Sequence, residues 1–101
     1  MSDWYLYLIR CNDGSFYTGI TIDVVRRLAE HQGEGNTGAK YVRGRRPLTL
    51  VLQKKVGSKG LAMKVERRVK KLSKAQKENL IVSNKHVEEI IRAERSKLNR
   101  Y

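Results

Sequence analysis

Trp4-Tyr5-Leu6-Tyr7-Leu8-Ile9 is followed by the turn residues Asn12-Asp13-Gly14-Ser15 and then by Phe16-Tyr17-Thr18-Gly19-Ile20, and this stretch decides the fold. Its aromatic and aliphatic residues favour strands. The Asp-Gly pair supplies the positive backbone angles of a tight hairpin. The stretch therefore predicts two strands that pair antiparallel across a short turn.

A helix is predicted directly after this hairpin. Asp23, or Thr21 before it, can cap a helix that reaches about Gln32. Its inward stripe is expected to hold Val24, Val25, Leu28 and Ala29. A hairpin followed by such a helix would bring together, on one face, Tyr7, Tyr17, Arg27 and His31.

The remaining elements are read from turn and capping signals. Residues 33–47 contain four glycines and the only proline, which predicts a loop, and Leu48 to Val56 is β-rich. Ser58 can cap a helix with apolar residues at helical spacing, and Ser73 with Gln76 resembles a capping box that starts another helix. This order predicts a small α+β fold, in which helices cover a three-stranded, mainly antiparallel sheet.

The C-terminal segment, residues 86–101, carries an apolar stripe formed by Val87, Ile90, Ile91 and Leu98. This helix could dock on the domain or project as a separate helix. A projecting stripe would offer a docking face to a protein partner, so an accessory subunit is one interpretation of the chain.

The charge balance points to a polyanionic partner. The chain of 101 residues holds 22 Lys and Arg against 10 Asp and Glu, a formal net charge of +12. Nucleic acid is the commonest such partner, although ribosomal proteins and proteins on anionic membrane surfaces give the same signal. Between Glu34 and Glu78, fourteen basic residues surround one acid, Glu66.

The chain offers no signal for secretion or for a membrane span. Cys11 is the only cysteine, which excludes an internal disulfide and a cysteine-rich zinc site. No run of about 18 apolar residues occurs, and the N-terminus lacks the basic-then-apolar pattern of a signal peptide. We therefore expect one cytoplasmic domain with no membrane segment.

Two short motifs and two later residues carry a resemblance to a known family. Tyr5-Leu6-Tyr7, then Tyr17-Thr18-Gly19, then Arg27 and later Glu66 resemble, in order and spacing, the GIY-YIG nuclease domain. The resemblance covers roughly residues 4–82. Within the family, the chain looks most like the small stand-alone bacterial members related to the structure-specific endonuclease group. Tyr5 stands where the family name has glycine, Thr18 replaces isoleucine, and Ile20 occupies a position where repair enzymes often carry lysine. On this basis we expect residues 1–84 to form the GIY-YIG-like domain and residues 85–101 to form a C-terminal helical extension.

The resemblance implies a phosphodiesterase that depends on one Mg²⁺ or Mn²⁺ ion. Glu66 would hold the metal, Tyr17 would accept a proton from the attacking water, and Arg27 would stabilise charge on the phosphoryl oxygens. Tyr7 and His31 would orient water or phosphate, or assist the base.

The chemistry of these residue types is compatible with the implied roles. Hydrolysis of a phosphodiester needs an activated water and compensation for negative charge at phosphorus. A phenol with a pKa of about 10 is a poor base unless a nearby cation lowers that pKa. Arg27 and a metal at Glu66 could do so, and the planar fork of arginine suits a phosphate.

Each of these residues also has a structural interpretation. Tyrosines in strands usually pack, Arg27 beside Arg26 can be solvated, and His31 can stabilise the C-terminal end of the helix dipole. Glu66 can pair with Lys70 four residues later. These interpretations leave unexplained why the one acid stands in an otherwise basic stretch.

Residues 33–38 match the pattern G-x-G-x-x-G, which is found in dinucleotide-binding folds. Here the pattern follows a helix, and no acid occurs at the required distance after it, which excludes a nucleotide cofactor. We interpret the segment as part of a loop that presents basic side chains to a backbone, with Tyr41 available to stack on a base. Together with the later helix, the nucleic-acid-binding residues expected are Lys40, Tyr41, Arg43, Arg45, Arg46, Lys70 and Lys71.

The sequence therefore predicts a metal-dependent DNA endonuclease that recognises shape, such as branched, nicked or damaged DNA, and binds through phosphates. The alternative is a non-catalytic module that binds DNA or RNA, or an accessory subunit. Charge supports both interpretations, and the ordered tyrosine, arginine and glutamate positions favour the enzyme.

Overall fold

The computed structural model describes residues 3–33 and 38–98. Its centre is an antiparallel sheet with the strand order β2-β1-β3, in which β1 (Trp4–Arg10) lies between β2 (Phe16–Thr21) and β3 (Thr49–Gly57). Gly14 adopts a φ of 83° in the turn between β1 and β2. The predicted α+β class and the predicted antiparallel hairpin are confirmed.

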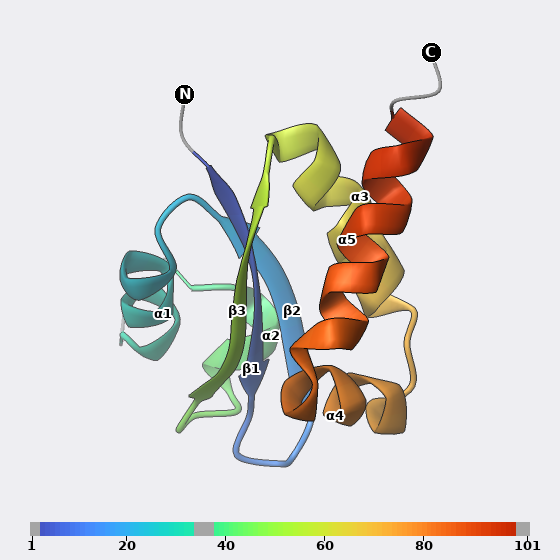
Figure 1. Cartoon of the computed structure of the whole chain (residues 1–101). Coiled ribbons are helices and arrows are strands. Elements are labelled where there is room, and N and C mark those ends of the chain that lie inside the picture. Colours follow the sequence, from blue (N-terminus) through green and yellow to red (C-terminus); the bar gives the residue numbers. More distant parts are fainter. Residues whose placement is uncertain (1–2, 34–37, 99–101) are drawn as a thin grey trace.

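Helices cover both faces of the sheet (Figure 1). On one side lie α1 (Val24–Gln32) and the short α2 (Lys40–Arg43), and on the other lie α3 (Lys59–Lys70), α4 (Lys74–Val82) and α5 (Asn84–Leu98). Neighbouring residues of a strand point to opposite faces. Leu6 and Leu8 therefore enter the core under α3 and α5, whereas Tyr7 and Ile9 enter a second core under α1 and α2.

The local signals for helix starts act as predicted. Asp23 caps α1 through its bond from the Arg26 amide, and Ser58 caps α3 through its bond from the Leu61 amide. Ser73 and Gln76 form the reciprocal capping box that starts α4. Each such cap contributes about 1 kcal/mol.

Two details of the first helical layer correct the sequence-based expectations. Val25 is 79% exposed and Ala29 is exposed, so the inward stripe of α1 consists of Val24, Leu28 and His31. A stripe at positions i, i+4 and i+7 leaves out Val25, and its third member is a histidine, which an apolar pattern does not reveal. The predicted loop over residues 33–47 contains the one-turn helix α2, and residues 34–37 of the rejected G-x-G-x-x-G pattern lie outside the described residues.

The C-terminal helix docks on the domain rather than projecting from it. Val87 is fully buried, and Ile90 and Ile91 are 8% and 5% exposed in the core shared with α3 and α4. Arg68 of α3 also pairs with Glu94 of α5 at 3.2 Å. Three of the four residues of the apolar stripe are thus covered within one chain, whereas Leu98 is 40% exposed, so little apolar surface is left for a protein partner at this face. None of the helices formed by the described residues combines the length and the apolarity needed to cross a membrane.

Candidate active site

The centre of the site is a buried pair formed by Tyr7 of β1 and His31 of α1. The Tyr7 hydroxyl lies 2.9 Å from Nε2 of His31, and the backbone amide of Ala39 donates to Nδ1 of the same ring at 3.1 Å. A backbone N–H can only donate, so Nδ1 carries no proton. The neutral ring therefore holds its proton on Nε2 and donates it to the Tyr7 oxygen.

Burial keeps both members of this pair uncharged. Tyr7 is 2% exposed and His31 is fully buried. Burial, with smaller contributions from the charges of Tyr17 and Glu66, raises the pKa of Tyr7 to about 12. Burial, together with the neighbouring charge of Arg27, lowers the pKa of His31 to about 4. At neutral pH, Tyr7 is thus a phenol and His31 a neutral imidazole.

Arg27 connects this pair to the surface. Its guanidinium donates to Glu30 at 2.9 Å and also hydrogen-bonds the Tyr7 hydroxyl. The Arg27 side chain is 31% exposed, so part of the guanidinium remains within reach of a ligand. His31 and Arg27 both donate to the Tyr7 oxygen, so the hydroxyl proton of Tyr7 points away from these two side chains.

Two glycines allow this close packing. Tyr7 and Gly19 are directly opposite in the β1–β2 register, and a Cβ on Gly19 would lie 2.5 Å from Cζ of Tyr7. A Cβ on Gly38 would lie 2.7 Å from Cα of His31. The glycine at position 19 therefore makes room for the Tyr7 ring, and the glycine at position 38 lets the chain approach α1 so that Ala39 reaches the imidazole.

Tyr17 lies beside the buried pair on the edge strand β2. Its ring centroid is 6.3 Å from that of Tyr7 and 5.2 Å from that of His31. Tyr17 is half-buried, and its hydroxyl takes part in no hydrogen bond with the described part of the chain. Of the two phenols, Tyr17 is thus the one whose hydroxyl is available to a ligand.

Glu66 reaches the site from the other layer. It lies on α3, which packs against the edge strand β2, and its charge is one of those that raise the pKa of Tyr7. The carboxylate also pairs with Lys70 at 3.6 Å. Of the five residues expected from the sequence, Tyr7, Tyr17, Arg27 and His31 therefore contact one another around the Tyr7 ring, and Glu66 is connected to them through its charge on Tyr7.

The donor set at Glu66 suits a hard divalent ion that keeps most of its water ligands. The described residues contain no group of three or more acidic, histidine or cysteine side chains that could enclose an ion. The Glu66 side chain is 22% exposed and supplies one hard carboxylate. Mg²⁺ keeps several of its waters and completes its shell with phosphate oxygens. One carboxylate therefore suits such an ion in the presence of a nucleic-acid phosphate, with weak binding in its absence.

The expected nucleic-acid-binding residues of the glycine-rich segment are partly used within the fold. The ring of Tyr41 stacks on Tyr17 with centroids 6.0 Å apart, and the Arg45 guanidinium lies 4.0 Å above the Tyr41 ring. Arg45 also donates to Asp13 at 3.2 Å. Tyr41 remains 39% exposed, so this stack borders the site at the surface.

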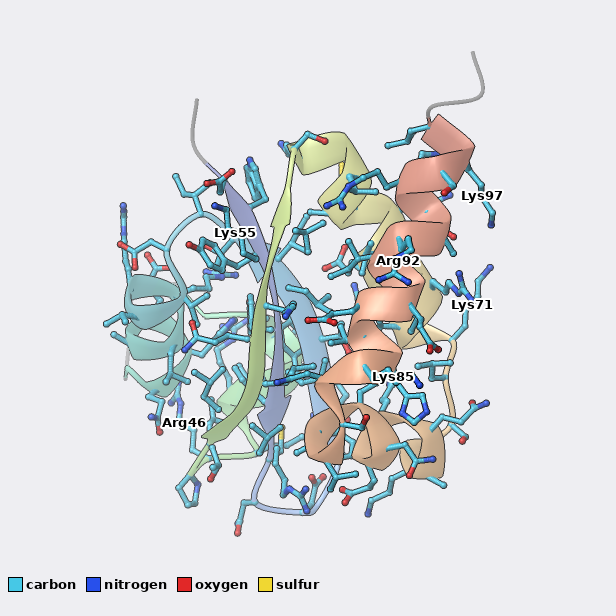
Figure 2. All side chains as sticks on the ribbon, viewed as in Figure 1. Arg46, Lys55, Lys71, Lys85, Arg92 and Lys97 are labelled. Carbon is cyan, nitrogen blue, oxygen red and sulfur yellow. The ribbon has the colours of Figure 1, made fainter. Side chains whose placement is uncertain are left out.

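The other basic residues of the prediction are spread around the molecule. Lys40 and Arg43 are exposed on α2, whereas Nε of Arg46 donates to the carbonyl of His31 at 2.9 Å. Arg46 thus satisfies the C-terminal end of α1. Lys70 is the last residue of α3 and Lys71 is its C-cap. In Figure 2, Lys71 lies on the opposite side of the sheet from Arg46. The seven residues do not form one continuous surface.

Sequence reasoning missed the groups that hold the site in place. These are the amide of Ala39, which fixes the His31 tautomer, and Glu30, which holds Arg27. The signal for Glu30 was available, because an arginine and a glutamate at i, i+3 are neighbours on a helix. The contact of Ala39 depends on the path of the chain after α1 and has no local signal.

A small α+β protein with paired tyrosines, a buried histidine and an arginine at the sheet edge defines a class, and comparison with known proteins identifies it. The family model described as the GIY-YIG catalytic domain matches residues 3–79. A UPF0213 protein of Cronobacter sakazakii is 52% identical over 81 residues, which cover 80% of this chain and 83% of that protein. A UPF0213 protein of Citrobacter koseri is 46% identical over 91 residues, which cover 90% and 89%.

Solved structures agree with these matches. The solution structure of the UPF0213 protein BH0048 from Bacillus halodurans has a TM-score of 0.51 at 46% identity, covering 79% of this chain and 83% of that one. The solution structure of EF2693 from E. faecalis has a TM-score of 0.56 at 38% identity, covering 80% and 84%. The chain belongs to the GIY-YIG family. Because this is a nuclease family, membership supports a nuclease role on DNA, and the resemblance inferred from the motifs is confirmed.

Proposed function

We propose that this protein is a divalent-metal-dependent endonuclease that hydrolyses phosphodiester bonds of DNA and selects its substrates by shape. The observation that supports this most is the contact of Tyr7 with Tyr17, His31 and Arg27, together with the reach of the Glu66 charge to Tyr7. A purely structural cluster of rings would not need an arginine on the Tyr7 hydroxyl or a carboxylate whose charge reaches it.

Tyr17 acts as the base in this proposal. The phenolate charge of one tyrosine opposes ionisation of the other, and Tyr7 is held neutral by burial. The two tyrosines lie in different environments, one buried and one half-buried, and can therefore take different roles in catalysis. Tyr17 in its phenolate form accepts a proton from water as the water oxygen forms its bond to phosphorus. The P–O bond to the leaving sugar oxygen breaks, and that oxygen takes up a proton from solvent water.

The remaining residues bind and orient. The exposed part of Arg27 stabilises the negative charge that develops on the phosphoryl oxygens. Tyr7 and His31 are positioning residues: His31 holds the Tyr7 hydroxyl through its Nε2–H, and this hydroxyl orients the Arg27 guanidinium that meets the phosphate. Glu66 would hold one Mg²⁺ or Mn²⁺ ion, which as a Lewis acid would supply further charge compensation at the phosphate.

Affinity in this proposal comes from phosphates rather than base edges. The net charge of +12 supplies a salt-dependent attraction to any nucleic-acid backbone. The catalytic-domain model matches residues 3–79, and the following helix α5 packs on this domain through Val87, Ile90 and Ile91. Branched, nicked or damaged DNA differs from plain duplex in the path of its backbone, so phosphate contacts can distinguish these substrates without reading bases.

Cleavage of branched, nicked and plain DNA with Mg²⁺ or Mn²⁺ tests the proposal. Tyr17→Phe and Glu66→Gln should keep DNA binding and lower the cleavage rate by about 100-fold or more. Tyr5→Phe is the matched control for loss of a phenol, because Tyr5 lies on the same sheet face outside the hydrogen-bonded group. Glu89→Gln, on the exposed side of α5, is the control for loss of one acid.

The outcomes separate the alternatives. Equal cutting by the wild type and all variants would indicate a contaminating nuclease and contradict the assigned roles. Tight binding by the wild type with no cutting under any metal would favour the non-catalytic DNA- or RNA-binding module. Loss of cutting in Tyr5→Phe as severe as in Tyr17→Phe would mean that the hydroxyl of Tyr17 has no special part.

A further inference from the structure

The ring of Tyr41 lies against the proposed base and has no part in the mechanism proposed so far. It stacks on the ring of Tyr17 with centroids 6.0 Å apart and planes 29° from parallel. The Tyr17 hydroxyl takes part in no hydrogen bond with the described part of the chain. Among the contacts of the Tyr17 side chain, ring packing therefore decides where this hydroxyl points. Tyr7 and His31 supply that packing from the buried side, and Tyr41 supplies it at the surface.

One guanidinium, that of Arg45, holds Tyr41 at two points. Its Cζ lies 4.0 Å from the centroid of the Tyr41 ring, which is a cation–π contact. Its Nη1 donates to the backbone carbonyl of Tyr41 at 2.6 Å. The ring and the backbone of Tyr41 are thus attached to the same side chain, so a displacement of Arg45 is passed on to the ring that packs on Tyr17.

Arg45 is in turn anchored to the hairpin that carries Tyr17. Its Nε donates to Oδ2 of Asp13 in the β1–β2 turn at 3.2 Å, and the backbone amide of Asn12 donates to the carbonyl of Arg45 at 2.8 Å. Oδ1 of Asp13 accepts from the amide and the hydroxyl of Ser15 at 3.0 and 2.6 Å. The hydrogen bonds from Ser15, with a smaller contribution from Arg45, hold the pKa of the Asp13 carboxyl below its usual range. The anchor of Arg45 is therefore a charged carboxylate at neutral pH.

These contacts engage most of the Arg45 guanidinium inside the fold. Nε is taken by Asp13, Nη1 by a carbonyl, and the planar face by the ring of Tyr41. An arginine that meets a phosphate presents its fork of N–H groups outward, with its charge uncompensated. The arrangement instead forms a closed chain of contacts, which leaves the hairpin at Asp13 and returns to it at Tyr17.

We propose that Tyr41 is a positioning residue for Tyr17, and that Asp13 and Arg45 hold Tyr41 in place. The proposal rests on the proposed function, because it takes Tyr17 as the base that accepts a proton from water. It adds that the rate of cutting depends on a carboxylate of the β1–β2 turn, through this chain of contacts rather than through the binding of DNA.

The test begins with Asp13→Asn, which removes the charge of the anchor and keeps the turn. Asparagine can accept the two bonds from Ser15, and an Asn-Gly pair favours the same tight turn as Asp13 with Gly14. Asp3→Asn is the matched control. Asp3 is an exposed aspartate that precedes β1, whereas Asp13 follows this strand, and it pairs with Lys55 at 3.2 Å.

Cutting and binding are measured separately. Both variants make the net charge more positive, so each should bind DNA in EDTA at least as tightly as the wild type. The single-turnover rate at saturating DNA should fall about fivefold in Asp13→Asn and stay within about twofold in Asp3→Asn. Tyr41→Leu should lose about tenfold, and Tyr41→Phe should recover most of that loss, since the stack needs the ring and not the hydroxyl. In the Tyr41→Leu background Asp13→Asn should have no further effect, because it acts through the ring.

NMR of tyrosine rings carrying an isotope label gives a readout that needs no cutting. The ring signals of Tyr17, identified by their loss in Tyr17→Phe, should move in Tyr41→Leu because the ring current of Tyr41 is removed. Asp13→Asn should move them in the same direction, and Asp3→Asn should leave them in place. Thermal unfolding of each variant checks that it is folded.

Unmoved Tyr17 signals in Asp13→Asn would overturn the proposal, whatever the rate of cutting. Tighter DNA binding by Asp13→Asn with an unchanged rate would also overturn it, because Arg45 would then be a phosphate contact that Asp13 restrains. Weaker binding by Tyr41→Leu with a normal rate at saturating DNA would assign Tyr41 to stacking on a base instead. Absence of cutting by the wild type would contradict the proposed function separately, and the Tyr17 signals would still decide whether Asp13 positions this ring.

Discussion

Acidification should destabilise this protein through one buried side chain, His31. In the folded chain its pKa is about 4, against 6.5 for an ordinary histidine. Between these two values the unfolded state binds more protons than the folded state, so the free energy of unfolding rises with pH through this window. The contribution of His31 is complete above about pH 6.5 and is lost as the pH falls to about 4.

The size of the effect follows from the same two pKa values. Their difference corresponds to about 3 kcal/mol, because each tenfold change in proton affinity is about 1.4 kcal/mol. The structural reason is that protonation puts a hydrogen on Nδ1, where the Ala39 amide already donates at 3.1 Å. A charged ring would also be desolvated, since His31 is fully buried.

Urea unfolding of the wild type, His31→Gln and His86→Gln at a series of pH values between 4.5 and 7.5 measures this contribution. His86 is the other histidine of the chain and is exposed on α5, so its variant is the matched control for removing an imidazole. Carboxylates that titrate in the same range are common to all three proteins and cancel in the comparison. His31→Gln should lose about 2–3 kcal/mol of pH dependence relative to His86→Gln. Identical pH profiles for the two variants would refute the inferred tautomer and its hydrogen bonds.

Two further predictions concern packing within the sheet. Gly19→Ala should destabilise the fold by about 1–3 kcal/mol and reduce cleavage, because the new Cβ displaces the Tyr7 ring. Gly60→Ala on α3 is the control: no atom lies within 4 Å of its new Cβ, so this variant should be neutral or stabilising by up to about 1 kcal/mol. Equal stability of the two variants in urea unfolding would contradict the close approach at Gly19. Thr18→Val should stabilise the fold by about 1 kcal/mol, because the Thr18 hydroxyl is buried and has no hydrogen-bond partner among the described residues, and a loss of stability in the same assay would show that the hydroxyl is satisfied after all.

Most of the secondary structure could be predicted because its signals are local. Alternating β-forming residues, an Asp-Gly turn and serine caps act over a few neighbouring positions and need no knowledge of the rest of the chain. The helix α2 has four residues and no side-chain cap, so nothing local announces it. It is held by tertiary contacts, since Val42 is fully buried and the Tyr41 ring stacks on Tyr17.

The sequence could predict which residues form the candidate site but not the hydrogen bonds and ring contacts between them. The order of the motif residues indicates which side chains come together, whereas the pairing of His31 with Ala39 depends on the close approach at Gly38. The stack of Tyr41 on Tyr17 has the same character, because these two rings become neighbours only when α2 packs beside β2. Counting basic residues in the sequence likewise could not tell those that face solvent from Arg46, which bonds the end of α1.

The division of labour between the two phenols follows from the order of the strands. In sequence, Tyr7 and Tyr17 look alike, since each stands within a short apolar strand beside other β-forming residues. In the sheet, Tyr7 lies on the central strand, where Gly19 and His31 cover it and burial raises its pKa to about 12. Tyr17 lies on the edge strand and stays half-buried. A central strand is covered by neighbours on both sides and an edge strand on only one, so a hairpin with two equivalent tyrosines yields one that is locked in the protein and one that can meet a substrate.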